Sequence, residues 1–210
     1  MTQDIFLHGL GQKPESWRET IACLDRPGPA ACPDLAGFAD KGAVTFERLY
    51  QGFADYTMSA EGPLNLCGLS LGAIIALRYA IERPERVQSL ILIGGRDEMP
   101  RGLLRLQNVL FRLLPERCFE QMGFAKGEIS QLTNSMLKLS FSAGLPGVAC
   151  PALVIRGEKD SANKKAAENL ARGLANAEAL VIEEAGHEVN VDAPRSLGAA
   201  IRGFYGKWQL

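Results

Sequence analysis

Short apolar runs that alternate with helical patterns most strongly constrain the fold of this 210-residue chain. The runs are bounded by turn residues and are apolar throughout, not only at every second position. They occupy residues 5–7, 64–67, 87–93, 152–155 and 180–182. Strands without a polar face are typical of parallel sheets that helices cover on both sides. The sequence therefore predicts an α/β fold built on a mostly parallel sheet.

Segments with apolar residues every three or four positions separate these runs. They cover residues 14–24, 44–58, 71–83, 163–175 and 194–208. Residues 96–148 carry no strand pattern and predict only short helices, for example over 103–114 and 128–139. We therefore expect a single domain over residues 1–210, with residues 96–148 as a helical cap inserted between two strands. Ligands bind beyond the carboxyl ends of such strands, so the cap would lie over the binding site.

The composition argues against several classes of protein. Twenty-three basic and 24 acidic side chains give a net charge of −1, a poor match to nucleic-acid binding. No apolar run approaches the roughly 20 residues of a membrane-spanning helix, and the N-terminus lacks the pattern of a signal peptide. The five cysteines form no CxxC pair, which predicts neither a disulfide framework nor a zinc site. We expect a cytoplasmic protein, monomeric or weakly dimeric, without nucleic-acid partners or stable membrane insertion.

Ser70 is the candidate nucleophile. It is the central residue of Gly68-Leu69-Ser70-Leu71-Gly72, which fits G-x-S-x-G and joins a predicted strand to a predicted helix. The two glycines allow a tight turn in which a β-carbon would clash, and the serine hydroxyl is presented above the sheet. The helix N-terminus at this point favours negative charge that develops during a reaction.

A serine hydroxyl needs a base, and this chain has only two histidines, His8 and His187. His187 lies just after the last predicted strand, at the same sheet edge as Ser70. We expect His187 to be the base, whereas His8 would be structural and hydrogen-bonded to its own loop.

The imidazole also needs an acceptor that fixes its tautomer. Asp160 follows the predicted strand over residues 152–155 and gives the chain order serine, aspartate, histidine. Asp97 follows the preceding strand and remains the alternative acid. Glu158 lies two residues earlier in the same turn as Asp160 and is a weaker candidate.

Two backbone amides are candidates for an oxyanion hole. The amide of Leu71 directly follows the nucleophile. The glycine-rich loop His8-Gly9-Leu10-Gly11-Gln12 follows the first predicted strand and could turn the amide of Leu10 into the site.

Four segments resemble the signature blocks of the α/β-hydrolase superfamily, in that family's order. They are HGLGQKPESW, LNLCGLSLGAIIALRYAIERPERVQSLILIGG, CPALVIRGEKD and AGHEVNVDAP. They are similar to the small, cap-bearing bacterial esterase and lipase-like members of that superfamily. The resemblance implies Ser70 as nucleophile, Asp160 as acid and His187 as base, with the amides of Leu10 and Leu71 as oxyanion hole. It implies no metal or organic cofactor.

The chain departs from the family pattern in two ways. It begins almost at the HG loop, so we expect about six strands where eight are common, and the cap is short. The cap is rich in leucine, and Leu106 and Leu110 are candidates for the acyl pocket, with Trp17 as an alternative location. Its several arginines would suit an anionic substrate, although a charged outer helix face explains them more simply.

The expected function is hydrolysis of small carboxylic esters with short to medium acyl chains. Thioesterases, C–C hydrolases, peroxidase-type members and a menaquinone-pathway synthase that eliminates pyruvate are alternatives on the same fold. The GEKD segment and the cap arginines resemble that synthase, but Ala73 and Ile74 stand where its substrate-binding arginine would be sought, so it ranks second. A non-catalytic ligand-binding protein is the alternative from a different class.

Overall fold

The computed structural model describes residues 2–26, 28, 30–39, 43–99, 102 and 124–210. Its centre is a six-stranded sheet with the order β2-β1-β3-β4-β5-β6, in which every neighbouring pair is parallel. The strands are β1 (Gln3–Leu7), β2 (Ala30–Ala31), β3 (Leu64–Leu69), β4 (Val87–Ile93), β5 (Ala152–Gly157) and β6 (Ala177–Ile182). This confirms the predicted fold class and the predicted number of strands.

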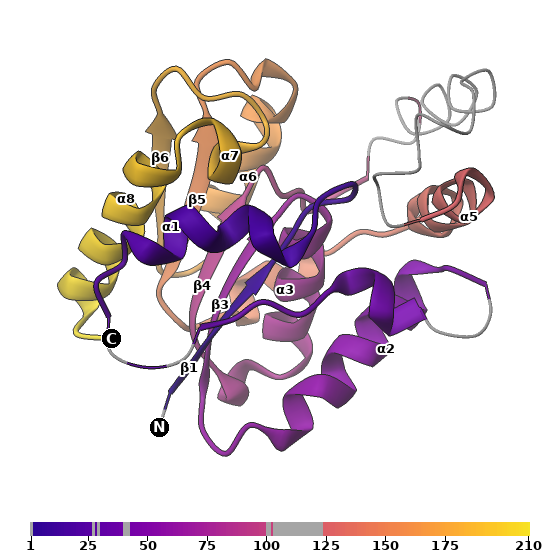
Figure 1. Cartoon of the computed structure of the whole chain (residues 1–210), viewed down its shortest axis with the longest axis horizontal. Coiled ribbons are helices and arrows are strands. Elements are labelled where there is room, and N and C mark those ends of the chain that lie inside the picture. Colours follow the sequence, from indigo (N-terminus) through magenta and orange to yellow (C-terminus); the bar gives the residue numbers. More distant parts are fainter. Residues whose placement is uncertain (1, 27, 29, 40–42, 100–101, 103–123) are drawn as a thin grey trace.

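Helices cover both faces of this sheet (Figure 1). One face carries α1 (Arg18–Ala22), α7 (Val189–Asp192) and α8 (Pro194–Trp208). The other carries α2 (Phe46–Tyr56), α3 (Leu71–Glu82), α5 (Lys126–Met136) and α6 (Lys164–Gly173). Short 3-10 helices are η1 (Pro14–Trp17), η2 (Leu35–Ala39), η3 (Thr57–Ser59), η4 (Pro84–Arg86), η6 (Ser142–Gly147) and η7 (Ser161–Asn163).

The alternation of side chains along each strand fills two separate apolar cores. In β4, Leu90 and Leu92 pack under α2, α3 and α5, whereas Ile91 and Ile93 pack under α8. All four side chains are fully buried. A strand buried on both faces has no position for a polar side chain, which explains why the central runs are apolar throughout.

The two edge strands differ from the sequence expectation. The two-residue β2 pairs with β1 and carries no apolar run that the sequence could reveal. At the other edge, Leu180 and Val181 of β6 are 37% and 46% exposed, although their run resembles a buried strand. An edge strand has a neighbour on one side only, so its apolar residues are less completely covered.

Helix boundaries follow the sequence patterns with one clear difference. The pattern over 14–24 is divided between η1 and α1, since Pro14 begins a 3-10 turn that changes to α-helix only at Arg18. The predicted helix over 128–139 corresponds to α5. The predicted helix over 103–114 lies outside the described residues.

The described part of residues 96–148 is attached to the main body by hydrogen bonds. The N–H groups of Val44 and Phe46, at the start of α2, donate to Gln131 Oε1 (3.2 Å) and Ser135 Oγ (2.8 Å) of α5. After α5 the chain returns to the end of β4, where the Phe141 N–H donates to the Asp97 carbonyl at 2.7 Å. These contacts hold α5 beside the carboxyl edge of the sheet.

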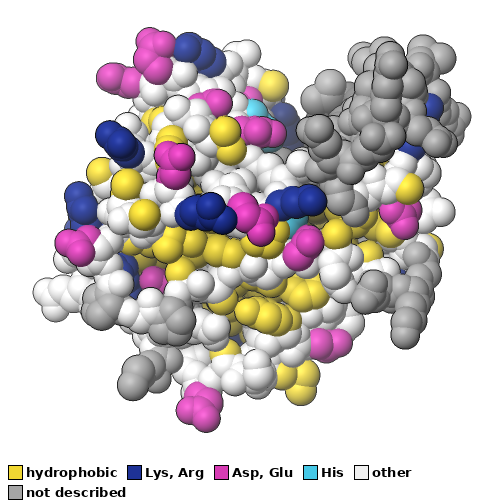
Figure 2. All heavy atoms as spheres, viewed as in Figure 1, with side chains coloured by type: hydrophobic (Ala, Val, Ile, Leu, Met, Phe, Trp, Pro, Cys, Tyr) yellow, Lys and Arg dark blue, Asp and Glu magenta, His cyan; other side chains and the backbone are white. Residues whose placement is uncertain are grey.

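The described residues show neither a strongly charged surface on the face drawn in Figure 2 nor a helix that could span a membrane. On the face seen in Figure 2, acidic and basic side chains are interspersed, with no broad area of one sign. No helix in the described ranges combines the length and the apolar character needed to cross a membrane.

Candidate active site

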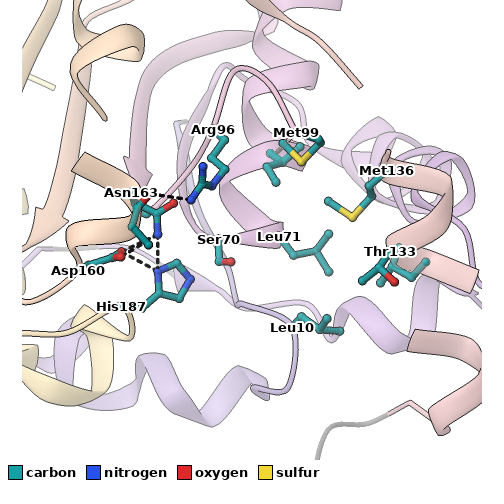
Figure 3. A pocket seen from close by; sticks show the side chains of 14 residues that line it. Leu10, Ser70, Leu71, Arg96, Met99, Thr133, Met136, Asp160, Asn163 and His187 are labelled. Carbon is teal, nitrogen blue, oxygen red and sulfur yellow. Dashed lines mark hydrogen bonds and ion pairs between the residues drawn. The ribbon is translucent and has the colours of Figure 1, made fainter. Parts of the chain in front are cut away.

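A cavity of about 380 Å³ lies beyond the carboxyl ends of the strands, between the sheet and α5. Ser70, Asp160 and His187, which the sequence predicts to act together, all line it (Figure 3). The described residues that line it are Leu10, Ser70, Leu71, Ile74, Gly94, Arg96, Met99, Leu132, Thr133, Met136, Asp160, Ala162, Asn163 and His187. The volume lies in the lower part of the range for small-molecule sites.

Ser70 occupies the tight turn between β3 and α3 that the sequence predicts. Its backbone has φ 53° and ψ −110°, a conformation that costs free energy for any residue other than glycine. The flanking glycines are required by close packing: a β-carbon on Gly68 would overlap the backbone of Gly72, and one on Gly72 would overlap the Leu7 carbonyl of β1. The turn therefore presents Ser70 at the start of α3, where unpaired helix N–H groups lie.

His187 and Asp160 form a direct pair. The Nδ1 atom of His187 lies 2.8 Å from Oδ2 of Asp160, so Nδ1–H donates to the carboxylate and Nε2 is left as the basic atom. The Asp160 side chain is 5% exposed and that of His187 is 40% exposed. The acid is therefore held within the protein, whereas the imidazole faces the cavity.

Asn163 completes this pair and was not singled out from the sequence. Its Nδ2 lies 2.9 Å from Oδ1 and 2.7 Å from Oδ2 of Asp160, and 3.1 Å from Nδ1 of His187. Its Oδ1 atom is buried and has no hydrogen-bond partner among the described residues. The amide thus holds the carboxylate through its N–H groups. The only sequence signal was its position three residues after Asp160.

Gly94, at the end of β4, makes room for the imidazole. Its φ is +57°, and a β-carbon would lie 2.8 Å from Cε1 and 3.0 Å from Nδ1 of His187. A side chain here would be strained and would displace the ring.

All three alternative residues have other partners, and Oε2 of Glu158 accepts from the Glu184 N–H at 3.0 Å. The carboxylate of Asp97 accepts a hydrogen bond from Ser142 Oγ at 3.0 Å. His8 is buried, with Nδ1 2.9 Å from the Gly9 carbonyl, and its Nε2 accepts from the Leu35 N–H at 3.0 Å. Both ring nitrogens of His8 are therefore occupied by the backbone.

The loop after β1 is tied to the segment that follows His187. Gln12 and Asn190 are buried and form a reciprocal amide pair, with both N···O distances 3.1 Å. Gln12 Oε1 also accepts from the Gly9 N–H at 3.3 Å, and Asn190 donates to Ser16 Oγ at 3.1 Å. This network fixes the loop that brings Leu10 to the cavity beside Leu71.

The Ser70 hydroxyl makes no hydrogen bond to His187 among the described contacts (Figure 3). Such bonds are often long before substrate binds, so the geometry does not argue against a serine–histidine relay. A serine at a helix N-terminus, an oriented imidazole and a mostly apolar cavity are together suited to acyl transfer.

The structure does not support the residues that the sequence predicts for the acyl pocket as it does those predicted for the catalytic group. Trp17 is fully buried in the core under α8, with its ring centroid 5.3 Å from that of Phe6, so the structure does not bring it to the cavity. Leu106 and Leu110 lie outside the described residues. Among the described residues, the cavity is lined by three apolar side chains that sequence reasoning missed, Met99, Leu132 and Met136. No group of three histidine, cysteine, aspartate or glutamate side chains within the described ranges is arranged to hold a metal ion.

Comparisons with known proteins agree with this architecture. A family model described as "Alpha/beta hydrolase family" matches residues 5–200. (E)-2-((N-methylformamido)methylene)succinate hydrolase of Acinetobacter baylyi is 22% identical over 241 residues, which cover 94% of this chain and 88% of that protein. A hydrolase from Pseudomonas aeruginosa has a TM-score of 0.83 at 19% identity, covering 98% of this chain and 90% of its own. A thermophilic esterase from Thermogutta terrifontis has a TM-score of 0.79 at 22% identity, covering 99% and 90%.

Proposed function

The chain belongs to the alpha/beta hydrolase family, and from this premise we propose that it is a serine hydrolase that cleaves carboxylic esters of small molecules. The observation that carries the proposal is the 2.8 Å pairing of His187 with Asp160 in the cavity that Ser70 also lines. Relatives named as hydrolases and an esterase with the same fold support the reaction class.

In the proposed reaction Ser70 Oγ attacks the ester carbonyl while His187 Nε2 takes its proton. Asp160 holds the imidazole in the tautomer with a free Nε2 and stabilises the imidazolium that forms. The amides of Leu10 and Leu71 donate to the oxyanion. His187 then protonates the leaving alcohol, and water attacks the acyl-enzyme with the same histidine as base. The products are the free acid and the alcohol.

The first test is Ser70→Ala together with labelling by a fluorophosphonate probe. We expect the native protein to be labelled on one serine and to hydrolyse nitrophenyl acetate, and the variant to lose both properties while remaining folded. Ser130→Ala on α5 is the control for the loss of a serine hydroxyl. Turnover by Ser70→Ala at the native rate would remove Ser70 from the mechanism. An unlabelled native protein would favour a non-catalytic binding role.

We further propose a preference for short to medium acyl chains. The cavity of about 380 Å³ has room for a small ester, and each buried methylene contributes about 0.8 kcal/mol. We expect kcat/KM for nitrophenyl esters to peak between acetyl and hexanoyl. A series that peaks at palmitoyl would contradict this preference without affecting the assignment of Ser70. Measuring kcat/KM for acyl thioesters of the same chain lengths would distinguish an esterase from a thioesterase.

Three expectations from the sequence, on the cap, the location and the cofactors, remain part of the proposal. Residues 96–148 act as a cap in a single domain, and the contacts of α5 with α2 support this role. The reaction takes place in the cytoplasm, with no metal or organic cofactor.

A further inference from the structure

Arg96 contributes a positive charge to the wall of the cavity. It lies two residues beyond Gly94, at the carboxyl end of β4, and lines the same cavity as Ser70 and His187 (Figure 3). Among the described residues, Arg96 is the only lysine or arginine in that lining. The side chain is half-buried, so water screens its charge less than that of a surface arginine.

Within the described part of the chain, the hydrogen bonds of Arg96 leave most of its donors unused. One Nη2–H donates to the Ala162 carbonyl at 2.9 Å, and no ion pair within 4.0 Å joins Arg96 to an acidic side chain among the described residues. Asp160 and Asp97, whose negative charges act on Arg96, are hydrogen-bonded to His187 and Ser142. A guanidinium has five N–H groups, so this one retains the capacity to bind an anion.

Burial acts against this charge. It lowers the pKa of the Arg96 guanidinium, and the negative charges of Asp160 and Asp97 partly offset that effect. Arginine stays protonated at any ordinary pH, so the cavity holds a cation that has lost part of its hydration. Binding of an anion compensates such a cation for the hydration it has lost. The planar guanidinium can donate two parallel hydrogen bonds to a carboxylate.

We propose that the preferred substrates are small esters that also carry a carboxylate, which the Arg96 guanidinium binds while Ser70 attacks the ester carbonyl. This inference rests on the proposed ester hydrolysis and adds the class of substrate. The apolar side chains of Leu71, Met99 and Met136 contact the carbon chain between the two groups. A single guanidinium beside two aspartates favours a singly charged group over a phosphate dianion, because the aspartates repel the second charge.

The test uses substrate pairs that differ only in charge. One series has the carboxylate on the acyl side, as in monomethyl esters of dicarboxylic acids, and the other has it on the alcohol side, as in acetylated hydroxy acids. Each ester is compared with the analogue in which a neutral primary carboxamide replaces the carboxylate and the ester is unchanged. The measured quantity is the ratio of kcat/KM for the charged ester to that for its neutral partner.

We expect the native ratio to exceed one in at least one series and to fall about 10- to 100-fold in Arg96→Gln, the range for a hydrogen bond to a charged group. Arg96→Lys should recover part of the ratio, since it restores the charge without the planar fork. Arg202→Gln is the matched control: Arg202 also donates to a backbone carbonyl, that of Cys23 at 3.0 Å, but lies on α8 outside the cavity.

The outcomes separate this inference from the proposed function. A native ratio of one or less in both series, with neutral esters turned over in a Ser70-dependent manner, would overturn the role of Arg96 and leave ester hydrolysis intact. Equal ratios in the native protein, Arg96→Gln and Arg202→Gln would also overturn it. A better rate with a phosphorylated ester would contradict the choice of carboxylate. If no ester is turned over and Ser70 is not labelled, the proposed function itself fails.

Discussion

At the residue scale, the two aspartates that the sequence offered as partners for His187 differ in what they contact. Asp160 binds the imidazole and the Asn163 amide, whereas Asp97 binds Ser142 in the segment that carries α5. The same residue type at the ends of neighbouring strands therefore has two different roles. Substitution by asparagine distinguishes these roles because it keeps the size of the side chain, removes its charge and replaces one acceptor oxygen by an N–H donor.

We expect Asp160→Asn to lower kcat on the order of 10⁴-fold, because its amide can donate to Nδ1 and favour the wrong tautomer, as in serine proteases. Asp97→Asn should change kcat by less than about tenfold and mainly lower the melting temperature. Steady-state kinetics with thermal melts of both variants provide the measurement. Inactivity of Asp97→Asn with an active Asp160→Asn would assign the acid to the end of β4.

Asn163 is predicted to be a positioning residue that acts through Asp160. Asn163→Ala removes the two N–H contacts that hold the carboxylate, so kcat should fall roughly tenfold, the kinetic equivalent of about 1.4 kcal/mol, with KM nearly unchanged. Asn163→Asp should cost more, because it places a second carboxylate beside Asp160. An equal loss of activity in the two variants, or a change confined to KM, would indicate a different role.

At the element scale, the Gln12–Asn190 pair joins the loop after β1 to α7, and so couples the candidate oxyanion loop to the segment that carries His187. Neither residue lines the cavity. Their effect on the reaction is therefore expected through the positions of backbone segments and not through contact with substrate.

Asn190→Ala leaves the buried Gln12 amide without its partner, which costs about 1–3 kcal/mol of folding stability. For a chain of this size we expect a melting temperature lower by roughly 2–12 °C, with kcat also reduced. Asn176→Ala is the control, because Asn176 donates to the Ala149 carbonyl at 2.7 Å far from this network. If both variants keep native kcat at a temperature where they are folded, the network serves stability alone.

At the scale of the whole molecule, the sheet separates two apolar cores, and the candidate site lies where the carboxyl ends of its strands emerge between them. Cys67 of β3 is fully buried in the core under α8, and burial raises the pKa of its thiol well above the usual value. Both effects suppress reaction of this thiol in the native state, since the thiolate is the reactive form.

Alkylation of Cys67 is therefore predicted to report global unfolding. In native buffer its modification should be far slower than that of the partly exposed Cys23, and denaturant should make the two rates similar. Peptide mass spectrometry after timed iodoacetamide treatment measures each site separately. Equal rates in native buffer would mean that the core under α8 opens without unfolding of the sheet.

Much of the fold and the centre of the site could be predicted from the sequence, because their signals are local. Apolar runs marked the bounds of β4 and the existence of β3 and β5, and the helical pattern over Pro194–Trp208 matches α8. The Ser70 turn was recognisable because its glycines and serine are adjacent in the chain. The positions of Asp160 and His187 after predicted strands, together with the carboxyl-edge rule, were then enough to predict that both lie near Ser70.

Only the tertiary structure decided which side chains meet across the chain. In the tertiary structure Trp17 lies in the core, Asn163 donates hydrogen bonds to Asp160, and Arg96 and α5 lie at the cavity. The physical reason is that a strand residue faces one side or the other according to register, and a loop side chain has no periodicity at all. Those choices depend on packing between segments tens of residues apart, which no local pattern records.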